Sequence, residues 1–179
     1  MLASYALHDY APVIPLLNIN AGDVVFDAAG GTGTLSSLVK RRFPETDVYC
    51  GDKAEITQQQ LYDGVQYLPF DLFEPWPICA DKLLLARVLH DWNDEQVALI
   101  FEHAKAALRP GGELFVLEMF LPTSGFGGGL CDLHLLAVTG GQERSENHYS
   151  ELLHNARFDV VETINGGSLV SVLRCRPKP

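Results

Sequence analysis

The feature that most constrains this chain is an apolar strand that runs directly into a glycine-rich turn and then into a helix. Residues 23–27 (DVVFD) have the character of a buried strand, and glycines follow at positions 30, 31 and 33. An apolar stripe at 35, 38, 39 and 43 then predicts a helix, which Pro44 ends. A strand, a turn and a helix in this order form the repeating unit of α/β proteins with parallel sheets.

The same alternation of strands and helices continues along the chain. Asn93 is expected to cap a helix, and the residues Pro110-Gly111-Gly112 are expected to turn the chain into the next strand. The further strands predicted before the C-terminal region are 47–50, 65–70, 82–88 and 113–121. Beyond them, the sequence predicts a glycine-rich loop at 123–129 and helices at 131–138 and 147–155.

The C-terminal end of the chain has a different pattern. Two β-prone runs, 158–164 and 169–174, are separated by Asn165-Gly166, which is a strong signal for a hairpin. A purely parallel sheet does not end in this way. The sequence therefore predicts an α/β fold with a mostly parallel sheet and a C-terminal antiparallel hairpin.

Composition excludes several classes of protein. The 179 residues carry a formal charge of −10, so a nucleic-acid partner is not expected, because such binding needs clustered Lys and Arg. No apolar run reaches the roughly 20 residues that span a bilayer, and the first ten residues do not resemble a signal peptide. The four cysteines (Cys50, Cys79, Cys131 and Cys175) form no metal-binding spacing. We therefore expect reduced, mostly buried thiols in a cytoplasmic protein with no membrane partner.

Acidic residues follow the strands next to the glycine-rich turn. Asp52 follows the second strand and Asp71 the third, and the carboxyl ends of parallel strands converge on one crevice. A dinucleotide-binding turn would have glycine at the sixth position counted from Gly31, where this chain has Ser36, so NAD is disfavoured. A turn used only for packing, and acids that are common loop residues, remain the alternatives.

One histidine and two glutamates are candidates for catalysis. His90 follows the apolar strand 82–88, and histidine acts as a base near neutral pH. Glu118 lies in an apolar strand, where a buried carboxylate needs a partner or a wet pocket. Arg87 would satisfy it as an ordinary ion pair. Glu143 follows Gly140-Gly141-Gln142, and on these residues alone a solvated loop charge is the simpler interpretation.

Taken together, these residues resemble the S-adenosylmethionine-dependent small-molecule O-methyltransferases of the caffeic acid and acetylserotonin type. The resemblance runs from about Pro12 to the C-terminus. Its motifs, in order, are 27–33 (DAAGGTG), 89–95 (LHDWNDE), 107–112 (ALRPGG) with Leu117-Glu118, and 140–145 (GGQERS) followed by Tyr149 and Leu152-Leu153. It implies a Rossmann-like class I methyltransferase sheet with helices on both faces.

The resemblance also implies ligands and residue roles. The cofactor would be S-adenosyl-L-methionine, the acceptor a hydroxyl of a small aromatic or polyketide-like molecule, and no metal site is expected. His90 would be the general base, with Glu118 and Glu143 flanking its ring and fixing its tautomer. The turn would hold the methionine end of the cofactor, Asp52 the ribose, and Asp71 and Leu72 the adenine. The implied cofactor-binding residues are Asp27, Gly30, Gly31, Gly33, Asp52, Asp71, Leu72 and Arg87.

Two departures from the family pattern bear on these expectations. The family turn has glycine where this chain has Ala29, which is harmless if the backbone there needs no positive φ. Family members also carry an N-terminal helical domain that mediates dimerisation. We expect residues 1–179 to be the catalytic domain without it, and an exposed apolar face in its place would favour a homodimer.

Two further functions stay open from the sequence alone. One is an enzyme of the same fold that binds the cofactor but performs non-methylating chemistry, although the set of His90, Glu118 and Glu143 argues against it. The other is a non-catalytic remnant that binds the cofactor or a partner.

Overall fold

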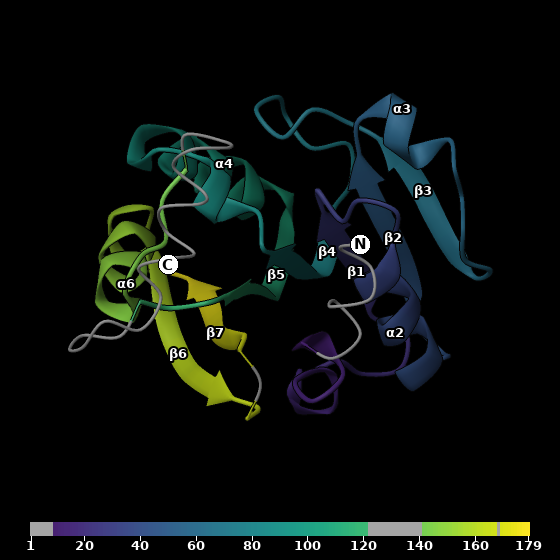
Figure 1. The fold of residues 1–179 in the computed structure, drawn as a ribbon, viewed down its shortest axis with the longest axis horizontal. Coiled ribbons are helices and arrows are strands. Elements are labelled where there is room, and N and C mark those ends of the chain that lie inside the picture. Colours follow the sequence, from purple (N-terminus) through teal and green to yellow (C-terminus); the bar gives the residue numbers. More distant parts are fainter. Residues whose placement is uncertain (1–8, 122–140, 168) are drawn as a thin grey trace.

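The computed structural model describes residues 9–121, 141–167 and 169–179, which form one seven-stranded sheet flanked by helices (Figure 1). The strand order is β3-β2-β1-β4-β5-β7-β6. Five strands pair in parallel, while β7 runs antiparallel to both β5 and β6. The predicted α/β class and the C-terminal antiparallel hairpin are therefore confirmed.

The elements lie close to where the sequence predicts them. The strands are β1 (Val24–Ala28), β2 (Asp47–Asp52), β3 (Val65–Pro69), β4 (Ala80–Ala86), β5 (Leu108–Glu118), β6 (Phe158–Asn165) and β7 (Ser171–Pro177). The helices are η1 (Ile14–Leu16), α2 (Thr34–Arg42), α3 (Ala54–Thr57), η2 (Leu89–Asp91), α4 (Asp94–Ala107) and α6 (Glu146–Asn155). The predicted loop 123–129, the predicted helix 131–138 and Cys131 lie outside the described residues.

Two apolar cores, one on each face of the sheet, show that helices cover both faces. Strand β4 illustrates the alternation, since Leu83 and Leu85 belong to one core and Leu84 to the other. The first core is closed by α4 and α6, through residues such as Phe101 and Leu153. The second core is closed by η1 and α2. A sheet covered in this way leaves its strand ends as the accessible edge.

The start of β5 differs from the prediction. The residues Pro110-Gly111-Gly112 were expected to precede a strand at 113–121, but they lie within β5. Ala80 pairs with Leu108 and Lys82 pairs with Glu113, so this segment is an irregularity in the ladder. Gly111 has a φ of 81°, which glycine adopts without steric cost. The segment therefore bulges within a strand that starts earlier and ends earlier than expected.

The helix that leads to the candidate site begins as the sequence predicts. The Asn93 side chain accepts a hydrogen bond from the Gln96 amide at 2.9 Å, and the Gln96 side chain accepts from the Asn93 amide, which forms a capping box. Helix α4 therefore starts just after Trp92, at the carboxyl edge of the sheet.

Two remaining sequence expectations concern cysteines and membranes. Of the cysteines in the described ranges, Cys50 and Cys175 are buried, Cys79 is exposed, and all three are free thiols. The helices of these ranges are all too short or too polar to cross a bilayer.

Candidate functional site

The glycine-rich turn is held to the end of β2 by its own amides. The Gly30 amide donates to the Gly51 carbonyl at 3.0 Å, and the Gly31 amide donates to the Asp52 carboxylate at 2.8 Å. A Cβ atom built on Gly31 would meet no atom within 4 Å, whereas one on Gly30 would collide with Asp27. Gly31 is therefore the glycine that borders open space, where a ligand can approach the backbone closely.

Asp27 packs against the buried side of this turn, in contact with Gly30. Its side chain has no exposed surface, and its Oδ2 accepts a hydrogen bond from the Ser36 hydroxyl at 2.7 Å. Burial raises the pKa of its carboxyl to about 7. Its Oδ1 has no hydrogen-bond partner. The structure does not bring Asp27 to the surface of the pocket described next, although the family resemblance implied that it binds the cofactor.

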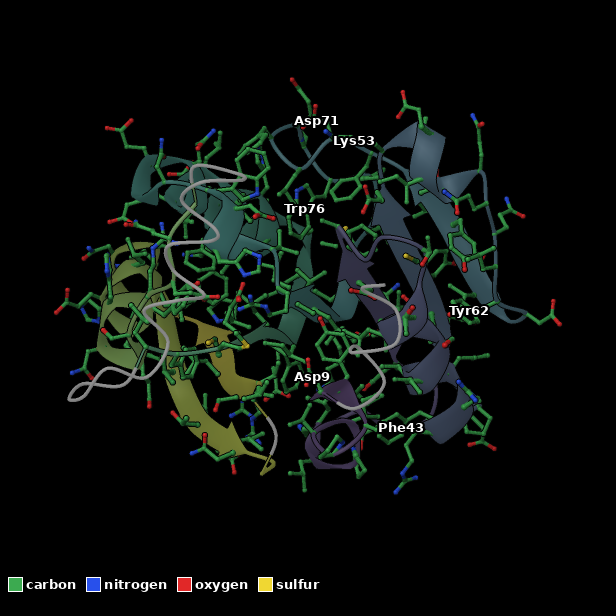
Figure 2. All side chains as sticks on the ribbon, viewed as in Figure 1. Asp9, Phe43, Lys53, Tyr62, Asp71 and Trp76 are labelled. Carbon is green, nitrogen blue, oxygen red and sulfur yellow. The ribbon has the colours of Figure 1, made fainter. Side chains whose placement is uncertain are left out.

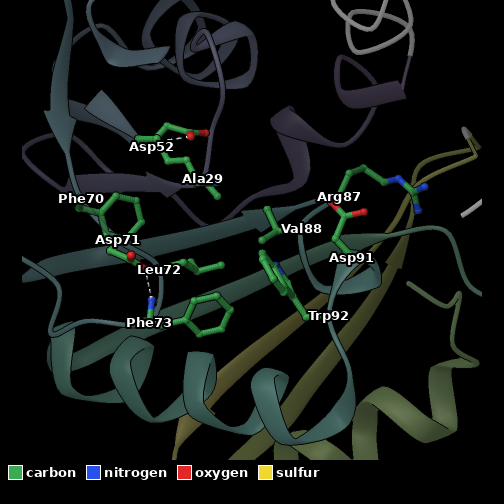
Figure 3. A pocket seen from close by; sticks show the side chains of 11 residues that line it. Ala29, Asp52, Phe70, Asp71, Leu72, Phe73, Arg87, Val88, Asp91 and Trp92 are labelled. Atoms are coloured by element: carbon green, nitrogen blue, oxygen red, sulfur yellow. Dashed lines mark hydrogen bonds between the residues drawn. The ribbon is translucent and has the colours of Figure 1, made fainter. Parts of the chain in front are cut away.

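A pocket of about 320 Å³ lies beside the turn, at the carboxyl ends of β1 to β4 (Figure 3). This volume is within the range of roughly 300–1,000 Å³ that is usual for ligand sites. Figure 3 shows Ala29 and Asp52 on one side, facing Val88 and Trp92 on the other. The residues that line it are Ala29, Asp52, Lys53, Phe70, Asp71, Leu72, Phe73, Arg87, Val88, Asp91 and Trp92.

Four of the residues expected to bind the cofactor line this pocket: Asp52, Asp71, Leu72 and Arg87. Figure 2 shows Asp71 close to Lys53 at the same edge of the molecule. The Asp71 carboxylate accepts a hydrogen bond from the Phe73 amide at 2.9 Å, which forms a local turn at this position. These residues lie where the sequence predicted them, and their contacts with a cofactor stay a prediction.

His90 and Glu118 are in direct contact, as expected. Nδ1 of His90 lies 3.1 Å from Oε2 of Glu118, and both residues are buried. Oε1 of Glu118 accepts hydrogen bonds from the amides of Val88 and Leu89, at 3.1 and 3.0 Å. An ionised carboxylate can only accept, so in a neutral imidazole this contact places the hydrogen on Nδ1 and leaves the lone pair on Nε2. Glu118 therefore fixes both the ring and the backbone that carries it.

Arg87 pairs with both glutamates at once. Its Nη1 donates to Glu118 at 3.0 Å and its Nη2 donates to Glu143 at 2.8 Å. Glu143 is buried, so it is not a solvated loop charge. The ring of His90 and the two carboxylates offer atoms that lie within 4.8 Å of one another. The ion pair that the sequence suggested for Glu118 is therefore present together with the His90 contact.

The site also contains residues that were not predicted from the sequence. Phe70, Phe73 and Trp92 supply aromatic surface to the pocket, and the rings of Phe73 and Trp92 pack edge to face at 4.7 Å. Asp91 lines the pocket, and its Oδ1 lies 3.5 Å from Nε2 of His90. The only signal for Asp91 and Trp92 was their position directly after His90.

Comparisons with known proteins show the family to which the chain belongs. Residues 10–159 match the O-methyltransferase domain family. A curated relative, 3-amino-4-hydroxybenzoate 4-O-methyltransferase of Streptomyces cremeus, is 32% identical over 84% of this chain and 44% of its own length. Human N-acetylserotonin methyltransferase, crystallised with S-adenosylmethionine, is 26% identical with a TM-score of 0.90, covering 99% of this chain and 54% of that one.

A second solved structure is an O-methyltransferase from neocarzinostatin biosynthesis, in complex with S-adenosylmethionine and 2-hydroxy-5-methyl naphthoic acid. It is 26% identical with a TM-score of 0.86, and the match covers 98% of this chain and 55% of that one. This chain spans about half the length of the curated relatives it matches. With a family match that extends over most of its residues, the chain belongs to the O-methyltransferase domain family.

Proposed function

We propose that residues 1–179 form the catalytic domain of an S-adenosyl-L-methionine-dependent O-methyltransferase. Its acceptor is a hydroxyl of a small aromatic or polyketide-like molecule, and His90 is the general base. The observation that carries the proposal is the contact between Nδ1 of His90 and Glu118 beside an aromatic pocket. The acceptor class is supported by relatives and neighbours that act on or bind hydroxybenzoate and hydroxynaphthoate compounds.

The pocket residues fit the proposed cofactor chemically. Each Asp52 oxygen accepts one protein hydrogen bond, so each retains a lone pair for a ribose hydroxyl. Leu72, Phe73 and Trp92 offer the apolar and aromatic surface that a flat base requires. The open space in front of Gly31 admits the methionine end. When bound, the cofactor supplies a methyl group on a cationic sulfur, which is transferred by in-line displacement.

His90 is proposed to remove the acceptor proton. A phenol has an ordinary pKa near 10, so at neutral pH it is a weak nucleophile unless a base takes its proton as the new bond forms. Nε2 holds the free lone pair, because Nδ1 donates to Glu118. Proton transfer of this kind contributes roughly 10²- to 10⁴-fold to a rate.

The charges around His90 support this role. The proton that moves to Nε2 creates an imidazolium, which Glu118 stabilises at Nδ1, as an aspartate does in hydrolase triads. Asp91 is the acid nearest Nε2, at 3.5 Å. Arg87 neutralises one of the two buried glutamate charges, which limits the cost of burying them. Glu143 is thus proposed to act through Arg87.

The proposal is tested by incubating the chain with S-adenosylmethionine labelled on its methyl group and a panel of phenols and hydroxynaphthoic acids. We expect label to appear in an O-methylated product. Cofactor binding with no product from any acceptor would contradict the proposal and favour the non-catalytic alternative. Label in a product methylated elsewhere, or a product changed without label, would favour other chemistry on the same fold.

A further inference from the structure

We propose that Arg144 is a positioning residue that fixes the orientation of His90 by holding the backbone of η2, the short helix that carries it. This proposal rests on the function proposed above, since it assigns a role within that reaction. Arg144 belongs to the motif at 140–145, of which only Glu143 had a role. It is 1% exposed and is the largest fully buried side chain in the described ranges.

The guanidinium of Arg144 spans the two ends of η2. Its Nη1 donates to the carbonyl of Leu89 at 3.0 Å, and its Nη2 donates to the carbonyl of Trp92 at 2.6 Å. The carbonyl of His90, which lies between them, accepts from the amide of Gln142 at 2.8 Å. The segment that contains Arg144 therefore holds three of the carbonyls around the proposed base.

Glu118 holds the same turn from the opposite direction. It accepts from the amides of Val88 and Leu89, while Arg144 and Gln142 donate to the carbonyls that follow. Glu118 on β5 therefore fixes amide groups of this segment, whereas Arg144 and Gln142, from another part of the chain, fix its carbonyl groups. A ring attached to a backbone held in this way has little freedom to move Nε2, and a displacement of about 1 Å can cost roughly 100-fold in rate.

Arg144 is itself held in place by Asp94 and His148. The Nε atom of Arg144 donates to Oδ1 of Asp94 at 2.9 Å, and Nε2 of His148 lies 2.9 Å from Oδ2 of the same carboxylate. Partial burial alone would raise the pKa of the Asp94 carboxyl, but these hydrogen bonds outweigh burial and lower the pKa. The Arg144 guanidinium also lies over the ring of Tyr149, at 5.7 Å from its centroid.

The role requires arginine and not merely a positive charge. Three separate acceptors, Asp94 and the carbonyls of Leu89 and Trp92, are bonded by three nitrogens of one rigid planar group. A lysine ammonium is a single point that cannot reach all three acceptors at once. Arg144→Lys therefore keeps the charge beside Asp94 but releases at least one of the carbonyls.

The test compares Arg144→Lys with the wild type in two measurements. We expect kcat for the best phenol acceptor to fall about 10- to 100-fold, with a much smaller change in the dissociation constant of S-adenosylhomocysteine. We also expect ¹⁵N spectra of the His90 ring to show the Nδ1–H tautomer in the wild type and a mixture of tautomers in the variant. A folded variant with wild-type kcat and an unchanged tautomer would overturn the proposal.

A matched control separates positioning from stability. Arg174 on β7 is also largely buried and pairs with two carboxylates, those of Glu113 and Glu162, but not with η2. We expect Arg174→Lys to lower the melting temperature and leave kcat and the His90 tautomer unchanged. If the control lowered kcat as much as Arg144→Lys does, the effect of Arg144 would be general destabilisation and the proposal would fail.

A milder variant keeps the proposal testable if Arg144→Lys does not fold. The side chain of His148 is 39% exposed, so His148→Ala should fold while removing one support of Asp94. We expect it to lower kcat in the same direction by a smaller factor, and an unchanged kcat would contradict the proposed bracing. If the wild type methylates no acceptor, the proposed function fails, and the tautomer comparison still decides whether Arg144 orients His90.

Discussion

At the scale of single residues, two non-glycine residues that line the pocket have a left-handed backbone conformation. Ala29 has a φ of 57° and Arg87 a φ of 56°. Such conformations are costly for residues with a Cβ atom, and they persist where the surrounding structure imposes them, often at functional sites. At Arg87, the amide donates to the carbonyl of Leu117 while the side chain reaches both buried glutamates. The strained backbone at Arg87 thus occurs together with the hydrogen bonds from Arg87 to the two glutamates beside His90.

Ala29 yields the first prediction. Alanine in place of the family glycine was expected to be harmless if the backbone there needed no positive φ, and the structure shows a positive φ. Ala29→Gly should therefore raise the free energy of unfolding by about 1 kcal/mol, because glycine occupies the left-handed region without the Cβ clash. Urea unfolding measures the change. A lower stability for the glycine variant would contradict the strain argument, and Ala98→Gly in the interior of α4 serves as a control that should destabilise.

Asp27 yields a prediction of pH dependence. Burial raises the pKa of its carboxyl to about 7 from an ordinary 3.8, so the folded chain holds this proton more tightly than the unfolded chain. The free energy of unfolding therefore falls as pH rises from about 4 to about 7, by an amount on the order of 4 kcal/mol from this group. Asp27→Asn should remove this fall. Urea unfolding of both proteins at several pH values measures it, and parallel profiles would contradict the assignment.

At the scale of elements, strand and helix positions followed from periodicity, but some boundaries did not. The apolar alternation and the Asn165-Gly166 turn were sufficient to predict the sheet and its antiparallel hairpin. The bulge at Pro110-Gly111-Gly112 was missed because a turn and an irregular strand share the same residues, and only pairing with β4 distinguishes them.

The candidate site, like the fold, was predicted in part. The proximity of His90, Glu118 and Glu143 was implied by the family resemblance, and the structure brings them together. The double pairing of Arg87 and the aromatic wall at Trp92 were not predicted, because distances across neighbouring strands and loops are not encoded in spacing along the chain.

Strand β3 supports the glycine-rich turn through one side chain. The Tyr67 hydroxyl donates to the carbonyl of Thr32 at 3.0 Å and accepts from the amide of Tyr62 at 3.2 Å. Tyr67→Phe should weaken binding of S-adenosylhomocysteine about five-fold, since a hydrogen bond of this kind contributes roughly 1 kcal/mol. Titration calorimetry measures the dissociation constant. Tyr49→Phe on β2 is the control, and equal effects of the two variants would contradict a specific role for Tyr67.

At the scale of the whole molecule, the two covered faces of the sheet explain where the site lies. Helices pack on both faces through separate apolar cores, so the carboxyl edge of the parallel strands is the place where loops are free to form a pocket. The turn after β1, the acid at the end of β2, the acid after β3 and the segment around η2 after β4 all meet there. The reversed strand β7 pairs with β5 and places Ser171 opposite Glu118, and β6 forms the edge of the sheet beyond it.

The imidazole held by Glu118 is proposed to remove a proton from the bound hydroxyl, and the other proposed roles in the site depend on this step. The most direct test measures kcat and the dissociation constant of S-adenosylhomocysteine on one preparation of His90→Gln. We expect turnover to fall by roughly 10²- to 10⁴-fold while the dissociation constant stays close to that of the wild type. Turnover equal to that of the wild type would contradict the claim, whatever the affinity for the cofactor.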